Sequence, residues 1–335
     1  MIDVDQLTRR FGARTAVDSL TFSVPRGQIV GFLGPNGAGK STTLKVLAGF
    51  LPPTSGTARI GGYDVVEASL EARRLIGYMP ESFPVYPEMR VDEYLRFRAE
   101  LKGVADRKKA VARALELADI TDVSRRLVGE LSKGYKQRVG LADAVVSSAP
   151  LLILDEPTEG LDPNQILRFR EVIRALGKDH TIFLSTHILS EVEAVCSNVI
   201  IIHKGRIATT GPIEAVRAEL EGGAREFSLA LALKADRREA WTADPLAAAK
   251  AALAEVEGAE VLRAAMTDGI ARVDVRVPTE GDVIEAVVAR CVGAHLGVRE
   301  VTPKGRSLEN VFHELTTRAT EAPPEAPKPR EEDAA

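Results

Sequence analysis

Short apolar runs and stretches of helical spacing alternate along the first two thirds of the chain. Continuous apolar runs occupy residues 28–33, 151–154 and 181–184, and each has the length of a buried strand rather than a helix. Helical spacing follows at 43–49 and dominates from about 81 to 149. This alternation predicts an α/β domain with a sheet core and a mostly helical subdomain. On the helix near 91–101 we expect Tyr94, Phe97 and Leu101 to face the core.

A second pattern begins after the Gly-rich break at 221–223. The order strand, helix, strand, strand, helix, strand suggests a ferredoxin-like sandwich. The strands are expected at 226–233, 259–265, 271–277 and 297–302, and the helices at 245–257, 281–292 and, after the last strand, 307–317. We therefore divide the chain into an α/β domain at 1–220, a small α+β domain at 224–318 and a disordered tail at 319–335, rich in Pro, Glu and Ala. The small domain has no cluster of chemically active residues, so its role stays open.

The chemistry concentrates first in a glycine-rich loop between the strand at 28–33 and the helix that begins near 43. The loop fits G-x-x-x-x-G-K-[ST], and strand, loop and helix are the context that a phosphate-binding loop requires. Glycines allow backbone N–H groups to converge on phosphate oxygens, Lys40 can reach the outer phosphates, and the Ser41 hydroxyl can bind Mg²⁺. The predicted nucleotide-binding residues are Gly34, Pro35, Asn36, Gly37, Ala38, Gly39, Lys40, Ser41 and Thr42.

Two carboxylates follow the apolar run at 151–154. Asp155 comes at the carboxyl end of the predicted strand, which suits a ligand of Mg²⁺. Glu156 comes next and is placed to orient and deprotonate a water molecule in line with a terminal phosphate. His187 follows the strand at 181–185, and a parallel strand would direct it toward the same phosphates. The other four histidines have no such setting, and we expect surface or half-buried positions for them.

A second anion-binding feature lies between these elements. Ser132 is a candidate N-cap for the helix after it, so its hydroxyl, the Gly134 amide and the helix dipole point the same way. No phosphate loop adjoins this helix, so it would serve the nucleotide of a second molecule. Asp162 lies in a Gly-Leu-Asp loop after the acidic pair.

Taken in order, these motifs resemble the ATP-binding subunit of an ABC transporter over about residues 1–218. The resemblance implies that ATP and Mg²⁺ are bound and that Phe11 stacks on the adenine. It also implies that Ser132 and Gly134 contact the γ-phosphate of the partner's ATP. Asp162 then matches a loop aspartate that communicates across the dimer, and His187 matches a γ-phosphate sensor.

The sequence departs from the family pattern at two places. Pro80-Glu81 stands where the family has Gln, so we expect Glu81 to join Ser41 and Asp155 as a metal ligand. Lys133 and Tyr135 replace a Gly and the Gln of the usual Leu-Ser-Gly-Gly-Gln signature. Both variants are similar to the gliding-motility-associated branch of type 2 ABC exporters.

Composition sets the remaining bounds. The chain has 335 residues, a formal net charge of -4 and a pI near 5.9, which give no reason to expect a nucleic-acid partner. Two widely spaced cysteines suit a reducing cytoplasm. No N-terminal signal segment is apparent, and no apolar run approaches the roughly 20 residues that cross a bilayer. Other chains would have to supply the membrane helices, which predicts a cytoplasmic protein, peripheral on the inner face of the membrane.

Together these features predict an ATPase subunit that dimerises and drives export through separate membrane-spanning permease subunits. The dimer partner would be a second copy or a paralogous ATPase chain. The alternative is a soluble ABC ATPase acting on ribosomes or DNA. Translation-associated members usually carry two cassettes, whereas this chain has one, and the heptads of DNA-repair members are not found between Lys40 and Asp155. A small-molecule kinase would leave the signature and Asp162 unexplained.

Overall fold

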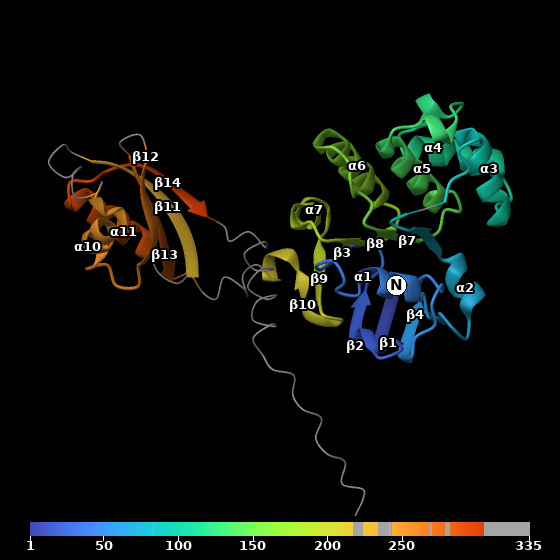
Figure 1. Ribbon diagram of the computed structural model, residues 1–335, viewed down its shortest axis with the longest axis horizontal. Coiled ribbons are helices and arrows are strands. Elements are labelled where there is room, and N and C mark those ends of the chain that lie inside the picture. The colour runs from blue at the N-terminus through green and yellow to red at the C-terminus, as the bar shows by residue number, and fades with distance from the viewer. Residues whose placement is uncertain are drawn as a thin grey trace, which may run out of the picture. The chain divides into compact units, whose positions relative to one another are not determined.

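The computed structural model describes residues 1–82, 84–216, 224–233, 241, 243–267, 270–278 and 282–304. The chain divides into two compact units, Met1–Ile213 and a second that begins at Glu214 (Figure 1). Each unit has its own sheets and apolar core, and each is described separately below.

The first unit contains two sheets. The larger has the strand order β10-β9-β3-β8-β7-β6, and all of its neighbouring pairs are parallel except β10 with β9. Its strands are β3 (Ile29–Leu33), β6 (Ile76–Met79), β7 (Leu151–Asp155), β8 (Thr181–Thr186), β9 (Asn198–His203) and β10 (Arg206–Pro212). The smaller sheet is antiparallel, in the order β2-β1-β4-β5. It consists of β1 (Ile2–Phe11), β2 (Arg14–Val24), β4 (Ser55–Ile60) and β5 (Tyr63–Asp64). The sheet core is therefore mixed, as the sequence predicted.

Helices α4, α5 and α6 of the first unit begin at side-chain caps that the sequence supplies. Asp106, Ser132 and Asp162 each accept a hydrogen bond from the backbone N–H three residues later, which satisfies an otherwise unpaired helix-end donor. The predicted N-cap at Ser132 is confirmed. The helices are α1 (Lys40–Leu47), α2 (Ser69–Arg74), α3 (Val91–Leu101), α4 (Arg107–Leu117), α5 (Lys133–Val145), α6 (Pro163–Leu176) and α7 (Leu189–Val195), with short 3₁₀ turns at η1 (Thr121–Val123) and η2 (Val128–Glu130). Figure 1 shows α3, α4 and α5 gathered as a helical lobe beside the end of the larger sheet at which β6 is the edge strand.

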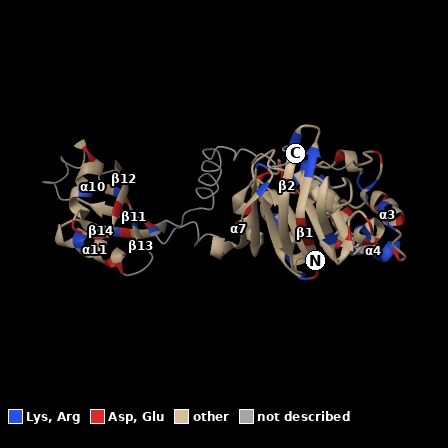
Figure 2. Cartoon of the chain, turned by 90° about the horizontal axis from the view of Figure 1, so that it is seen from below, with Lys and Arg blue, Asp and Glu red and all other residues tan. Residues whose placement is uncertain are grey.

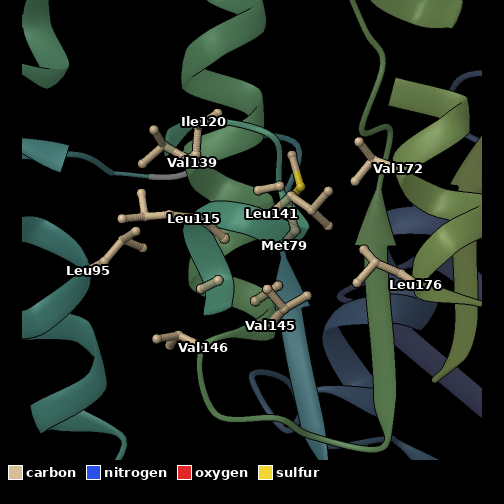
Figure 3. Close-up of a cluster of buried hydrophobic side chains, with 14 of the residues drawn as sticks. Met79, Leu95, Leu115, Ile120, Val139, Leu141, Val145, Val146, Val172 and Leu176 are labelled. Atoms are coloured by element: carbon tan, nitrogen blue, oxygen red, sulfur yellow. The ribbon is translucent and has the colours of Figure 1, made fainter. Parts of the chain in front are cut away.

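The parallel strands are buried on both faces, which explains why they read as continuous apolar runs. On β7, Leu152 and Leu154 join the core under the helical lobe, whereas Leu151 and Ile153 join a second core on the opposite face. Figure 3 shows the first of these cores, in which Met79 at the end of β6 packs beneath helix α5.

The prediction for α3 is correct at Tyr94, which is buried, and wrong at Leu101, which is 63% exposed at the last turn of its helix.

The second unit is a ferredoxin-like sandwich. Its elements are β11 (Ala224–Ala232), α10 (Pro245–Leu253), β12 (Glu260–Thr267), β13 (Ile270–Pro278), α11 (Val283–Gly293) and β14 (Gly297–Lys304). The sheet has the order β12-β13-β11-β14 with all pairs antiparallel, so the predicted order of strands and helices is confirmed. Alternate residues of β13 are buried with Ala249 and Val287 of the helices. The helix expected at 307–317 and the tail at 319–335 lie outside the described residues.

The other face of this sheet is charged rather than apolar. Acidic and basic side chains both occur along its strands (Figure 2). Arg276 on β13 lies 2.9 Å from Glu226 of β11 and 3.2 Å from Glu260 of β12, so one guanidinium links three strands. Cross-strand pairs of this kind hold register on a face that water reaches.

Candidate functional site

The glycine loop connects β3 to α1 and depends on two glycines. A Cβ at Gly34 would lie 2.5 Å from the carbonyl oxygen of Ile202, so no side chain fits there. Gly39 has φ 107°, a left-handed conformation, and a Cβ on it would lie 2.6 Å from the carbonyl oxygen of Ala16. The backbone is thereby held close to its neighbours at both ends of the loop, and the loop leads directly into the N-terminus of α1, where anions bind.

Lys40 is buried at the base of this loop. Its Nζ donates to the carbonyl oxygens of Gly34, at 2.6 Å, and Pro35, at 3.2 Å. The same ammonium lies 3.1 Å from Oε1 of Glu156. The loop carbonyls therefore bind their own lysine, and the carboxylate of Glu156, the residue after β7, also contacts it.

Asp155 ends β7 and is almost fully buried. Its Oδ1 accepts hydrogen bonds from the Ser41 hydroxyl at 3.0 Å and from the Ser185 hydroxyl at 2.6 Å. Burial raises the pKa of Asp155, and these two hydroxyls oppose the shift. The two predicted metal-binding groups Ser41 and Asp155 thus lie in direct contact.

Glu156 is fixed at the first position beyond β7. Its backbone N–H lies 3.2 Å from the carbonyl oxygen and 3.1 Å from the hydroxyl of Ser185, because β7 and β8 run in parallel register. Its φ is 46°, an unusual value for a non-glycine residue that occurs often at functional sites. Nδ1 of His187 lies 2.9 Å from Oε2 of Glu156. The parallel strand β8 thus brings His187 to Glu156, whereas its predicted contact with phosphates stays a prediction.

A pocket of about 430 Å³ lies at this site. The pocket is lined by Phe11, Arg14, Ala16, Asn36, Gly37, Gly39, Lys40, Ser41, Thr42, Glu81, Glu156 and Glu159. Phe11 is 45% exposed, and the Arg9 guanidinium lies 4.7 Å from its ring centroid. Phe11 is the last residue of β1, and β2 follows it before β3 begins.

Glu81 follows β6 and contributes to the same pocket. Loss of hydration raises the pKa of Glu81, and the nearby carboxylates of Glu159 and Asp155 raise it further. The pocket lining therefore includes the carboxylates of Glu81, Glu156 and Glu159, with the charge of Asp155 near Glu81. Glu159 was not singled out from the sequence, although its place in the turn directly after Glu156 was a usable signal.

The predicted residues of the signature segment and of the Gly-Leu-Asp loop do not line this pocket. Ser132 caps α5 through a 3.4 Å contact with the Tyr135 N–H. Gly134 packs so closely that its Cβ would lie 2.2 Å from the side-chain oxygen of Gln165. Asp162 caps α6 by accepting from the Gln165 N–H at 3.0 Å. The start of α5 thus packs on the start of α6, away from the lining of the pocket.

Two further expectations concern the remaining histidines and the metal. His180 was expected at the surface or half-buried, but it is buried, with Nδ1 2.8 Å from the carbonyl oxygen of Ala149. His313 lies outside the described residues.

Within those residues, no group of three or more His, Cys, Asp or Glu side chains could hold a metal ion. In the same part of the chain, no helix combines the length and apolar character needed to span a bilayer.

A glycine loop over a buried lysine, with an acidic pair at the end of a parallel strand beside it, defines a P-loop nucleotide hydrolase. A family model described as ABC transporter matches residues 17–159. The bacitracin transport ATP-binding protein BcrA of Bacillus licheniformis is 40% identical over 216 residues, 64% of this chain and 70% of that protein. The chain therefore belongs to the ABC transporter family, as an ATP-binding subunit with ATPase activity, which confirms the predicted family.

Other comparisons extend this result. The linearmycin resistance ATP-binding protein LnrL of Bacillus subtilis (strain 168) is 28% identical over 321 residues, covering 95% of this chain and 99% of that protein. A solved structure titled as an ATP-binding subunit of an ABC transporter is 33% identical, with a TM-score of 0.60, and covers 65% of this chain and 92% of that chain. The similarity to LnrL thus continues through the region of the second unit.

Proposed function

We propose that this chain is the ATP-hydrolysing subunit of an ABC exporter, which pairs with a second ATPase chain and drives separate membrane-spanning permease subunits. The observation that carries the proposal is the link from Lys40 through Glu156 to His187 at one end of the glycine-lined pocket. The names of two relatives, in bacitracin transport and linearmycin resistance, support export rather than uptake. No observation favours the alternative of a ribosome- or DNA-associated ATPase.

ATP fits the pocket by shape and charge. The loop from Gly34 to Gly39 supplies backbone N–H groups, and Lys40 supplies a cation for the outer phosphates. The exposed ring of Phe11 at the pocket wall is proposed to stack on the adenine.

Mg²⁺ is the proposed resident cation, held by the Ser41 hydroxyl, the Asp155 carboxylate and Glu81. The direct contact between Ser41 and Asp155 and the place of Glu81 in the pocket lining support this assignment, because a divalent cation would offset the negative charge of these carboxylates. Since the protein offers only a few oxygen ligands here, the choice suits Mg²⁺, which keeps waters and phosphate oxygens in its shell. When bound, the cation would neutralise negative charge on the phosphates.

Glu156 is the proposed general base. Its carboxylate is within 2.9 Å of the His187 ring and 3.1 Å of the Lys40 ammonium, so both of its oxygens are oriented by neighbours. In this role Glu156 accepts a proton from the attacking water, while His187 holds the carboxylate and contacts the terminal phosphate.

The second chain is proposed to complete each site with its own signature segment. Ser132 and Gly134 lie at the start of α5 outside their own chain's pocket, and Ser132 is exposed. A helix N-terminus with a hydroxyl cap binds anions, so it suits the γ-phosphate of ATP on the other chain. Asp162, at the start of α6 against Gly134, is proposed to carry the contact across the dimer.

A groove of about 600 Å³ beside the nucleotide pocket is the proposed docking place for the permease. Its lining combines aromatic side chains such as Phe50 and Tyr78 with the basic Lys45 and Arg73. Pro80 lines this groove, and the next residue, Glu81, lines the nucleotide pocket. Occupancy of the groove and closure of the nucleotide site are therefore expected to affect each other, at the cytoplasmic face of the membrane.

Replacing Glu156 by Gln tests this function. The variant keeps the shape of the side chain but loses the proton acceptor, so turnover should fall by about 10²–10⁴-fold while ATP binding survives. With ATP and Mg²⁺, size-exclusion chromatography should show a stable dimer. A variant that stays monomeric and hydrolyses ATP at the normal rate would overturn the assignment of Glu156.

A further inference from the structure

Glu191 is a buried carboxylate that the mechanism above does not use. It lies in the first turn of α7 and is 3% exposed. Oε2 accepts a hydrogen bond from the Thr186 hydroxyl at 2.7 Å, and Oε1 accepts one from the Thr158 hydroxyl. Among the described residues, no lysine, arginine or histidine forms an ion pair with it.

The two threonines belong to the two segments that carry the proposed catalytic groups. Thr158 lies in the turn that follows Glu156, where the Glu159 N–H lies 3.1 Å from the Glu156 carbonyl oxygen. Thr186 ends β8 and directly precedes His187. One carboxylate therefore joins the chain just after Glu156 to the chain just before His187.

The usual helical role of such a residue does not account for Glu191. An acid at this position of a first turn often caps its own helix by accepting from the N-cap backbone N–H. Here that donor, Ile188 N–H, lies 3.0 Å from the Thr186 hydroxyl instead. Burying a carboxylate without a cationic partner is costly unless its oxygens are hydrogen-bonded, and both oxygens of Glu191 are engaged by the threonines.

We propose that Glu191 is a positioning residue for ATP hydrolysis, which holds His187 in register with Glu156 through Thr186 and Thr158. This inference rests on the proposed roles of Glu156 and His187. Displacement of one segment would move the other, because the link passes through short side chains that are buried at Thr158, Thr186 and Glu191. The hydrogen bond of 2.9 Å between His187 and Glu156 is the contact that this link maintains.

The test compares Glu191→Ala, Glu191→Gln and Thr158→Val with Glu193→Gln, an exposed acid on the same helix. Glu191→Ala and Thr158→Val should lower kcat by about 10- to 100-fold, the cost of a displaced catalytic geometry, while KM for ATP stays within about twofold. Glu191→Gln should recover most of the rate, since its amide can bond both threonines. Thr158→Val keeps the carboxylate, so it remains informative if Glu191→Ala fails to fold.

Histidine NMR separates positioning from simple stability. The ring signals of His187, assigned with a His187→Gln variant, should change in Glu191→Ala and Thr158→Val and stay unchanged in Glu193→Gln. Unchanged His187 signals, or a loss of rate that only follows a loss of melting temperature and is not rescued by Glu191→Gln, would overturn the inference. Changed His187 signals together with normal turnover in Glu156→Gln would support the link while rejecting the proposed general base.

Discussion

Nζ of Lys40 lies 3.1 Å from Oε1 of Glu156, in an ion pair between the glycine loop and the end of β7. The other oxygen of the same carboxylate lies 2.9 Å from Nδ1 of His187. Phosphate oxygens and the Glu156 carboxylate would therefore compete for the Lys40 ammonium. The Lys40 ammonium proposed to bind the phosphates and the Glu156 carboxylate proposed to deprotonate the attacking water are therefore paired before any chemistry occurs.

This competition predicts that Glu156→Gln tightens ATP binding. A neutral amide holds the ammonium less strongly than a carboxylate does, by about 1 kcal/mol, so the affinity should rise about fivefold. The measurement is equilibrium titration with ATP and Mg²⁺ in a Ser132→Arg background, where dimer closure should not contribute. Glu159→Gln is the control, because Glu159 lines the same pocket without contacting Lys40. Equal effects of the two substitutions would show that only general charge matters.

Glu81→Gln is expected to keep ATPase activity but weaken the dependence of ATP binding on Mg²⁺. Glu81 adds a negative charge to a pocket that Glu156 and Glu159 also line, with Asp155 nearby, and this charge disfavours phosphates unless a cation is present. The measurement is nucleotide affinity with Mg²⁺ and with a chelator. Glu88→Gln, an exposed acid in the same connection, serves as the control. An identical affinity ratio in wild type and Glu81→Gln would mean that Glu81 does not face the ion.

Gly34→Ala should reduce both ATP affinity and folding stability. The added Cβ would lie 2.5 Å from the Ile202 carbonyl oxygen, so the loop or β9 must move. We expect destabilisation of about 1–3 kcal/mol, typical of overpacking, with more than tenfold weaker ATP binding. Gly293→Ala is a matched control, because nothing lies within 4 Å of its added Cβ. Thermal unfolding and ATP titration of both variants decide the matter, and equal behaviour would contradict the steric account.

Many elements and candidate site residues of the first unit could be predicted, because the candidate site residues lie in short contiguous motifs. The glycine loop, Asp155 and Ser132 lie in contiguous motifs flanked by recognisable strands and helices. Parallel register then explains why His187 meets Glu156, although 31 residues separate them. The elements of the second unit were also predictable, since its strands alternate clearly.

The features that the sequence did not predict depend on contacts between segments that are distant in the chain. Leu101 fits the apolar face of α3 by spacing, but the helix ends there and leaves it exposed. His180 has no motif around it, and its burial results from the approach of the chain at Ala149. Glu191 looks like an ordinary acid in the first turn of a helix, and only the fold brings Thr158 and Thr186 to it.

The central claim is that two chains share each ATP site, and mixing two inactive variants tests it most directly. Lys40→Ala should disable a chain's own phosphate loop, whereas Ser132→Arg should disable only the signature offered to its partner. A mixed dimer then has one intact site and one site with both lesions, so the mixture should form an ATP-dependent closed dimer that retains bound ATP, measured by size exclusion with labelled nucleotide. If the mixture retains no more ATP in a closed dimer than either variant alone, the shared-site account is contradicted.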